Sequence, residues 1–176
     1  SRLAVMTRLQ TIVTHLAIAA PLPVESDNVI WPEGIRFERE PNISLENYRK
    51  LYDMVGRRWH WVNRRRLDDR QLAALIHHPA TEIFVLRRSG DAIGYVELNF
   101  RLFPQVEIVF FGLIESEIGN GLGPHMMKRS MQIIKERNPK KVIIQTCTLD
   151  HPAALKLYQR SGFAAYKRKQ VEIIDD

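Results

Sequence analysis

Three closely spaced glycines between an apolar segment and a helical pattern constrain this chain more than any other feature. Residues 106–113 are apolar and aromatic, which indicates a strand, and Gly119, Gly121 and Gly123 follow it. The spacing of apolar residues then predicts a helix from Gly123 to about Glu136. A strand, a glycine turn and a helix present backbone N–H groups and the positive end of a helix to an anion. We therefore expect a ligand that carries phosphate groups.

Two common phosphate-binding loops fit this turn poorly. A nucleoside-triphosphate loop places Lys and then Ser or Thr directly after its last glycine, whereas Pro124 follows Gly123 here. A dinucleotide-binding loop requires a third glycine for close packing of the helix on the strand, and Pro124 occupies that position. A different kind of loop is needed to explain the pattern.

The turn resembles the pyrophosphate-binding loop of the GNAT N-acetyltransferase superfamily, usually written Arg/Gln-x-x-Gly-x-Gly/Ala. A second segment agrees with this, because residues 142–148 indicate a strand and residues 151–163 predict a helix that ends in Gly-Phe. That segment is similar to the GNAT signature Asn-x-x-Ala-x-x-Leu-Tyr-x-x-x-Gly-Phe and matches it at Ala154, Leu157, Tyr158, Gly162 and Phe163. The resemblance covers roughly residues 34–170. Segments 56–61 and 146–155 resemble a bacterial-type subfamily known mainly from uncharacterised members.

The resemblance implies an α/β (α+β) GNAT fold, with a mixed, mostly antiparallel sheet, flanking helices and a splayed strand pair that binds CoA. We expect residues 1–34 to form an N-terminal strand or extended arm of the same domain, and residues 35–176 to form the acetyltransferase domain. Periodicity and capping residues predict strands at 11–18, 35–40, 82–88, 92–100, 106–113, 141–148 and 163–171, and helices at 44–55, 68–76, 123–136 and 152–161.

The resemblance also assigns residues to acetyl-CoA. The Arg or Gln of the family motif falls on Ile118, so one phosphate donor is absent, and Lys128 or Arg129 could supply charge instead. Gly112 is compatible with a bulge where the central strand would bind the pantetheine arm. The expected CoA contacts are Phe111, Leu113, Ile118, Gly119, Asn120, Gly121, Leu122, Gly123, Pro124, His151, Ala154 and Tyr158.

In the family an amine attacks the thioester directly, so the enzyme must remove a proton from the amine and assist the thiolate. Tyr158 matches the tyrosine that often protonates the thiolate, although it could instead hold CoA by contact alone. An amine with a pKa of about 10.4 is only roughly one part in a thousand neutral at pH 7. The first candidate base is Glu107, followed by Glu97 and His151, and either glutamate could instead be an exposed strand residue.

The cysteine and histidine residues argue against a disulfide, a Cys–His hydrolase and a zinc site. The single cysteine, Cys147, excludes an internal disulfide and favours a reducing cytoplasm. Its place in an apolar strand favours a buried thiol over a Cys–His hydrolase formed with His151. His77 and His78 have no zinc spacing, so we expect no metal.

Charge and hydropathy limit the partners. The net charge of +6 is concentrated at residues 57–58, 64–66 and 167–169, without a nucleic-acid-binding motif. These clusters favour a solvated face, the 3′-phosphate of CoA, or an acidic substrate or partner over nucleic acid. No apolar run is long enough to span a membrane, and residues 12–20 indicate a strand more than a secretion signal.

The resemblance therefore implies transfer of an acetyl group from acetyl-CoA to a primary amine of a small molecule or a protein. Trp59 and Trp61 could stack on this acceptor or pack on the sheet. Because Ile118 stands where the family motif has Arg or Gln, a non-catalytic CoA-binding sensor or partner-binding module is an alternative function. Monomer and homodimer are both compatible with the sequence.

Overall fold

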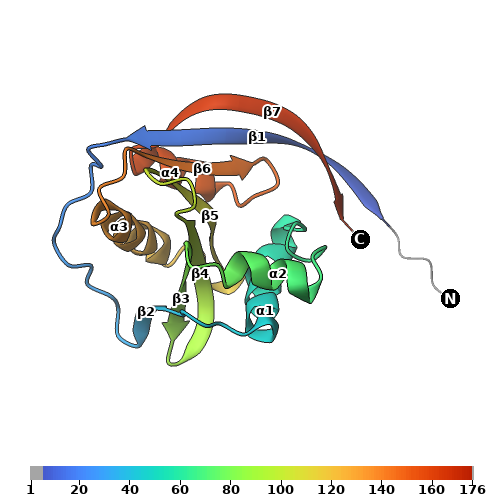
Figure 1. The fold of residues 1–176 in the computed structure, drawn as a ribbon, viewed down its shortest axis with the longest axis horizontal. Helices are drawn as coiled ribbons and strands as arrows, with labels where there is room; N and C mark the ends of the chain where they lie inside the picture. The colour runs from blue at the N-terminus through green and yellow to red at the C-terminus, as the bar shows by residue number, and fades with distance from the viewer. Residues whose placement is uncertain (1–5, 176) are drawn as a thin grey trace.

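The computed structural model describes residues 6–175, which form a single sheet with helices on both faces (Figure 1). The strands are β1 Thr7–Ala19, β2 Ile35–Arg39, β3 Thr81–Arg88, β4 Asp91–Asn99, β5 Gln105–Leu113, β6 Lys141–Cys147 and β7 Ala164–Asp175. The helices are α1 Leu45–Gly56, α2 Asp69–Ile76, α3 Leu122–Lys135 and α4 Ala153–Arg160, with 3-10 turns at Arg57–Trp59 and Glu115–Glu117. Their order matches the one predicted from sequence.

The strand order is β2-β3-β4-β5-β6-β1-β7. Only β5 and β6, among the strands described, run parallel, and every other neighbouring pair is antiparallel. The mixed, mostly antiparallel sheet expected from the sequence is therefore confirmed.

Two hydrophobic clusters fix the helices to the sheet. Helix α1 buries Tyr48, Leu51, Tyr52 and Val55, whose three- and four-residue spacing places them on one stripe. They pack with α2 against one face of the sheet. Helix α3 packs its methionines against the opposite face, where α4 also contributes partly buried side chains. Within residues 6–175, no helix combines the length and the apolar character required to cross a membrane.

The ends of α1 and α2 follow local signals. The Ser44 hydroxyl accepts a hydrogen bond from the Asn47 N–H at 3.1 Å and caps α1. Asp68 and Gln71 form both hydrogen bonds of a capping box at the start of α2. Helix α1 ends at Gly56, where a Cβ would lie 2.4 Å from the ring of Trp61. This close approach brings the chain after α1 back across the sheet.

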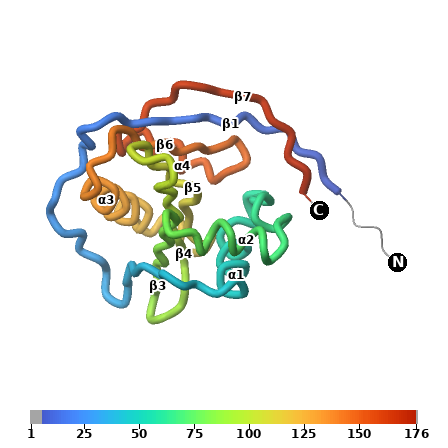
Figure 2. The backbone as a smooth tube through the Cα atoms, in the orientation of Figure 1, coloured from blue at the N-terminus to red at the C-terminus, as the bar shows by residue number. Residues whose placement is uncertain are grey.

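Strand β1 lies inside the sheet, between two strands from the other end of the chain. It pairs with β6 from Val13 to Ala19 and with β7 from Thr7 to Ala17. Its first half therefore forms a two-stranded ribbon with β7, which arches past β6 (Figure 2). We call this pair the β1–β7 ribbon. It brings the end of β7 to the segment between α1 and α2, where Asp175 contacts His60 and Arg65.

Strands β5 and β6 separate halfway along β5. Their ladder runs from Gln105–Lys141 to Ile108–Ile144 and then ends. Beside it, Glu97 of β4 pairs with Phe110 and Leu98 pairs with Ile108, so Val109 is the extra residue of a bulge. The splayed strand pair is therefore present.

The bulge predicted at Gly112 is wrong, because Gly112 pairs regularly with Tyr95. Glycine is required at this position for a different reason. A Cβ there would lie 2.6 Å from Val55 Cγ1 and 3.1 Å from the Trp61 ring, so the glycine lets α1 and Trp61 approach the strand.

Candidate active site

A cavity of about 1280 Å³ opens where β5 and β6 separate. This exceeds the roughly 300–1,000 Å³ of an ordinary small-molecule site, so it can hold a large ligand with a second molecule. One part, the glycine-turn half, is lined by Ile118, Gly119, Gly121, Gly123, Pro124, Lys156 and Arg160. The other part, the ribbon half, is lined by Val13, His15, Trp59, Trp61, Arg66, Phe110, Lys167 and Lys169.

The glycine turn leaves its backbone open to a ligand. Gly119 and Gly121 have φ values of 90° and 81°, in the left-handed region that favours glycine. A Cβ at either position would meet nothing within 4 Å among residues 6–175, its chain neighbours aside. Gly121 also caps α3, so the free N–H groups of the first helical turn point toward the same space.

The residues predicted for this turn divide into two groups. Ile118, Gly119, Gly121, Gly123 and Pro124 line the cavity as expected. Asn120 is exposed outside the cavity wall, and the Leu122 side chain is buried in the core under α3. Leu122 anchors the helix, and its backbone alone could meet a ligand.

Cations of both α3 and α4 line the cavity, because Lys128, Lys156 and Arg160 all belong to its wall. Lys128, one expected substitute for the missing Arg or Gln, bonds the Asp27 carboxylate at 2.9 Å, and this hydrogen bond lowers the pKa of Asp27. Arg129, the other, donates to Gln132. Lys156 and Arg160 line the cavity one helical turn apart, and no ion pair holds either within residues 6–175. Their spacing of four residues was the sequence signal for this pair.

Tyr158 is buried beside the splayed strands. It is 5% exposed, and its ring meets those of Phe111 and Phe163 at centroid distances of 5.9 and 6.5 Å. Burial raises the pKa of the Tyr158 phenol, and the nearby charge of Asp150 raises it further. The phenol therefore remains protonated at neutral pH, so it holds a proton that a leaving group can accept.

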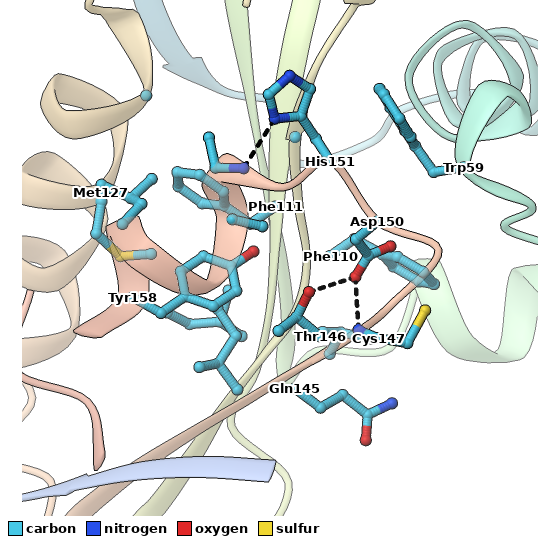
Figure 3. A pocket seen from close by; sticks show the side chains of 18 of the residues that line it. Trp59, Phe110, Phe111, Met127, Gln145, Thr146, Cys147, Asp150, His151 and Tyr158 are labelled. Atoms are coloured by element: carbon cyan, nitrogen blue, oxygen red, sulfur yellow. Dashed lines mark hydrogen bonds between the residues drawn. The ribbon is translucent and has the colours of Figure 1, made fainter. Parts of the chain in front are cut away.

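Asp150 is a cavity residue that sequence reasoning missed. It lies in the turn after β6, and Figure 3 shows it beside the opening that Tyr158 also borders. Its Oδ2 accepts hydrogen bonds from the Thr146 hydroxyl at 2.5 Å and the Cys147 N–H at 3.0 Å. Its Oδ1 accepts one from the Trp61 indole at 3.2 Å. An aspartate just before His151 was the available signal, but the sequence did not show that it faces a cavity.

Both candidate tryptophans line the ribbon half and also pack locally. Trp61 lies 5.1 Å from Phe110 and 5.9 Å from Tyr52 between ring centroids. Trp59 meets His151 edge to face at 5.3 Å. The two expectations for these residues are compatible, because both tryptophans pack on neighbouring rings and also line the cavity.

Glu97 lies on the α1 face of the sheet, outside the cavity wall. It is 1% exposed, receives a hydrogen bond from the Tyr48 hydroxyl at 2.6 Å, and pairs with Arg64 at 2.5 Å. Its two carboxylate oxygens are occupied by Tyr48 and Arg64, so Glu97 is not positioned to contact a ligand in the cavity.

Glu107 faces the same side of the sheet, opposite Asn99 in the ladder. Burial raises its pKa, which suits a base more than an ion-paired carboxylate does. Its side chain is outside the cavity wall formed by the described residues.

The alternative Cys–His chemistry finds no support in the geometry. Burial and the charge of Asp150 raise the pKa of the Cys147 thiol, which disfavours a thiolate. His151 Nδ1 is occupied by the N–H of Ala153 at 3.0 Å. Among residues 6–175, no group of His, Cys, Asp or Glu side chains has an arrangement that could hold a metal ion.

The opened strand pair beside a glycine turn at a helix start is an arrangement suited to an extended, anionic ligand along a strand edge. A family model described as the acetyltransferase (GNAT) family matches residues 48–163. The chain therefore belongs to this family, and the resemblance noted from its two motifs is confirmed.

Similar proteins agree with this assignment. N-alpha-acetyltransferase 30 of Schizosaccharomyces pombe is 28% identical over 61 residues, which are 35% of this chain and 40% of that protein. A GCN5-related N-acetyltransferase from Sphaerobacter thermophilus shares the fold with a TM-score of 0.65 and 16% identity, over 94% of this chain and 51% of that chain. A GCN5-related N-acetyltransferase from Kribbella flavida has a TM-score of 0.60 and 18% identity, over 97% of this chain and 60% of that chain. The chain thus spans between two fifths and three fifths of these relatives.

Proposed function

We propose that this protein transfers an acetyl group from acetyl-CoA to a primary amine. The observation that carries the proposal is the opening between β5 and β6, which ends at the glycine turn. The free edge of β5 after Ile108 suits the amide groups of a pantetheine arm, and the turn suits a pyrophosphate. Lys156 and Arg160 lie where they can meet the remaining phosphate charge.

Direct transfer of the acetyl group requires one proton donor for the thiolate and one proton acceptor for the amine, and the protein offers candidates for both. The amine nitrogen forms a bond to the thioester carbon, and the carbon–sulfur bond breaks. The departing thiolate takes the Tyr158 phenol proton, and the attacking nitrogen releases one proton. The products are the N-acetylated amine and CoA, so atoms and charges balance once solvent returns a proton to Tyr158.

Three carboxylates are candidates to receive the proton of the amine. Asp150 is the one in the cavity wall, next to the phenol that would protonate the thiolate. Glu107 lies on the α1 face and would act through water. The ion pair of Glu97 with Arg64 makes Glu97 the weakest candidate.

A non-catalytic CoA-binding module is the second candidate function. Ile118 replaces the Arg or Gln of the family motif, and Lys128 is already paired with Asp27. Both observations remove positive charge from the phosphate end. Such a module would bind CoA without releasing a thiol.

Calorimetric titration with acetyl-CoA, followed by a thiol-release assay with a panel of amines, tests these proposals. The panel includes peptide N-termini, because one relative is named as an N-alpha-acetyltransferase. We expect micromolar binding and amine-dependent release of CoA. Binding without release across the panel supports the non-catalytic module. Failure to bind at millimolar acetyl-CoA contradicts both.

A further inference from the structure

Two lysines of β7 face the ribbon half of the cavity. Lys167 pairs with His15 and Lys169 pairs with Val13 across the antiparallel ladder, so all four side chains share one face of the β1–β7 ribbon. All four line the cavity. The next residue of β1 on the opposite face is Leu16, which is buried in the core with α3. We call Lys167 and Lys169 the β7 lysine pair.

The β7 lysine pair carries charge that this part of the molecule does not neutralise. Within residues 6–175, no salt bridge holds Lys167 or Lys169, and both are exposed. The nearby acids have other partners. Asp175 contacts His60 at 2.6 Å and Arg65 at 2.9 Å, and Glu172 accepts from Arg8 and Gln10. The Asp150 carboxylate already accepts three hydrogen bonds.

The position of the pair separates it from the phosphate end of the cavity. The phosphate-binding candidates Lys156 and Arg160 belong to α4, which packs with α3 against the other face of the sheet. The β7 lysine pair faces the same side of the sheet as Phe110, with the tryptophans of the 59–61 segment. This separation favours a role for the β7 lysine pair at the acceptor over the expected role at the 3′-phosphate of CoA.

We propose that the β7 lysine pair is an anion subsite for the acceptor, which is a primary amine that also carries a carboxylate or phosphate group. This inference rests on the proposed acetyl transfer. The anionic group contacts the lysines, while the amine reaches the opening between Asp150 and Tyr158. The anionic group of such a molecule is attracted by the β7 lysine pair and its amine by the Asp150 carboxylate. The second amine of a simple diamine would instead be repelled by the β7 lysine pair.

Matched pairs of amines test the subsite with the full chain. The panel comprises phosphoethanolamine with ethanolamine, lysine with cadaverine, and tyrosine with tyramine, each at saturating acetyl-CoA. We expect the anionic member of at least one pair to have a kcat/KM about tenfold higher, which corresponds to one charge-assisted hydrogen bond of about 1.4 kcal/mol. The phosphate and carboxylate pairs distinguish the two anionic groups.

Charge reversal at one lysine links the preference to β7. Lys169→Glu should remove the tenfold preference and leave acetyl-CoA affinity unchanged. The matched control is Lys140→Glu, because Lys140 is exposed outside the cavity wall and gives the same change in net charge. This control should keep the preference. Amines that react without a preference, or a preference that survives in Lys169→Glu, would overturn the subsite alone.

A failure to detect acetyl transfer with any amine would test the proposed function and not the anion subsite. If no amine of the panel releases CoA, the proposed acetyl transfer fails, and the subsite is then tested by equilibrium binding. Phosphoethanolamine and lysine are titrated into the CoA-loaded protein and into its Lys169→Glu variant. Weaker binding to the variant supports the anion subsite, whereas equal binding, or none to either protein, rejects it.

Discussion

At the scale of single residues, the burial of Tyr158 decides which proton chemistry it can perform. Aromatic neighbours and the Asp150 carboxylate both disfavour a phenolate, so the raised pKa keeps the proton on Tyr158. In the proposed transfer, the departing CoA thiolate is the group that accepts this proton. The same environment makes Tyr158 unsuited to act as the base.

Tyr158→Phe should lower kcat about a hundredfold, because one general-acid contact is lost, while the affinity for acetyl-CoA stays within about twofold. Steady-state thiol release and calorimetry measure the two quantities. Because the pKa of Tyr158 is raised above 10, wild-type turnover should not lose this donor as pH rises from 7 to 10. Tyr166→Phe is the control, since Tyr166 is exposed outside the cavity wall. An equal loss of turnover and affinity would assign Tyr158 to binding.

At the scale of elements, the glycine turn and the opened strand pair together form the proposed CoA site. The turn aims free N–H groups into the space that β5 leaves when it separates from β6. Neither element is sufficient alone, because a pyrophosphate needs the turn and a pantetheine arm needs the strand edge. Their proximity follows from β5 and α3 being consecutive in the chain, apart from one 3-10 turn.

Gly121→Val should weaken acetyl-CoA binding more than tenfold, because a branched side chain is strained at a φ of 81° and obstructs the backbone. Gly90→Val is a matched control. Gly90 also has a positive φ, 91°, and open surroundings, but lies in the β3–β4 turn away from the cavity. Both variants should lose similar thermal stability, and calorimetry should find a binding defect in the first alone. Equal affinity in both variants would contradict the loop assignment.

Local signals in the sequence predicted local structure well. The Ser44 cap, the Asp68 capping box and the glycine turn each depend on residues a few positions apart, and each forms as expected. The bulge at Val109 was missed because it depends on how β5 aligns with β4, which no single-strand pattern encodes. The orientation of Lys169 was missed for the same reason, since its pairing with Val13 of β1 determines it. Asp150 is held by its neighbours Thr146 and Cys147, but its place in the cavity depends on Trp61, which is distant in the sequence.

At the scale of the whole molecule, β1 connects β7 to the rest of the sheet. It is the sole link in the ladder between β6 and β7 among the strands described. Leu16, at its centre, is fully buried against the α3 side of the core. Packing of this N-terminal strand therefore contributes to the stability of the whole domain.

Leu16→Ala should lower the free energy of unfolding by about 2–5 kcal/mol, as expected for a large-to-small change in a core. Ile12→Ala in the same strand should cost less than about 1 kcal/mol, because Ile12 is 47% exposed. Chemical denaturation of both variants provides the comparison. Similar small losses would show that β1 packs only loosely on the sheet.

The interior position of β1 also has a consequence during synthesis. β1 leaves the ribosome before every other strand of this sheet, yet its neighbours β6 and β7 are the last two. Thr7 cannot form its ladder pair until its partner Asp175 has been synthesised. Strand β1 has two unpaired edges until β6 has emerged and one unpaired edge until β7 has emerged, so native pairing around it is completed last. A chaperone that shields an extended apolar segment would act best in that interval.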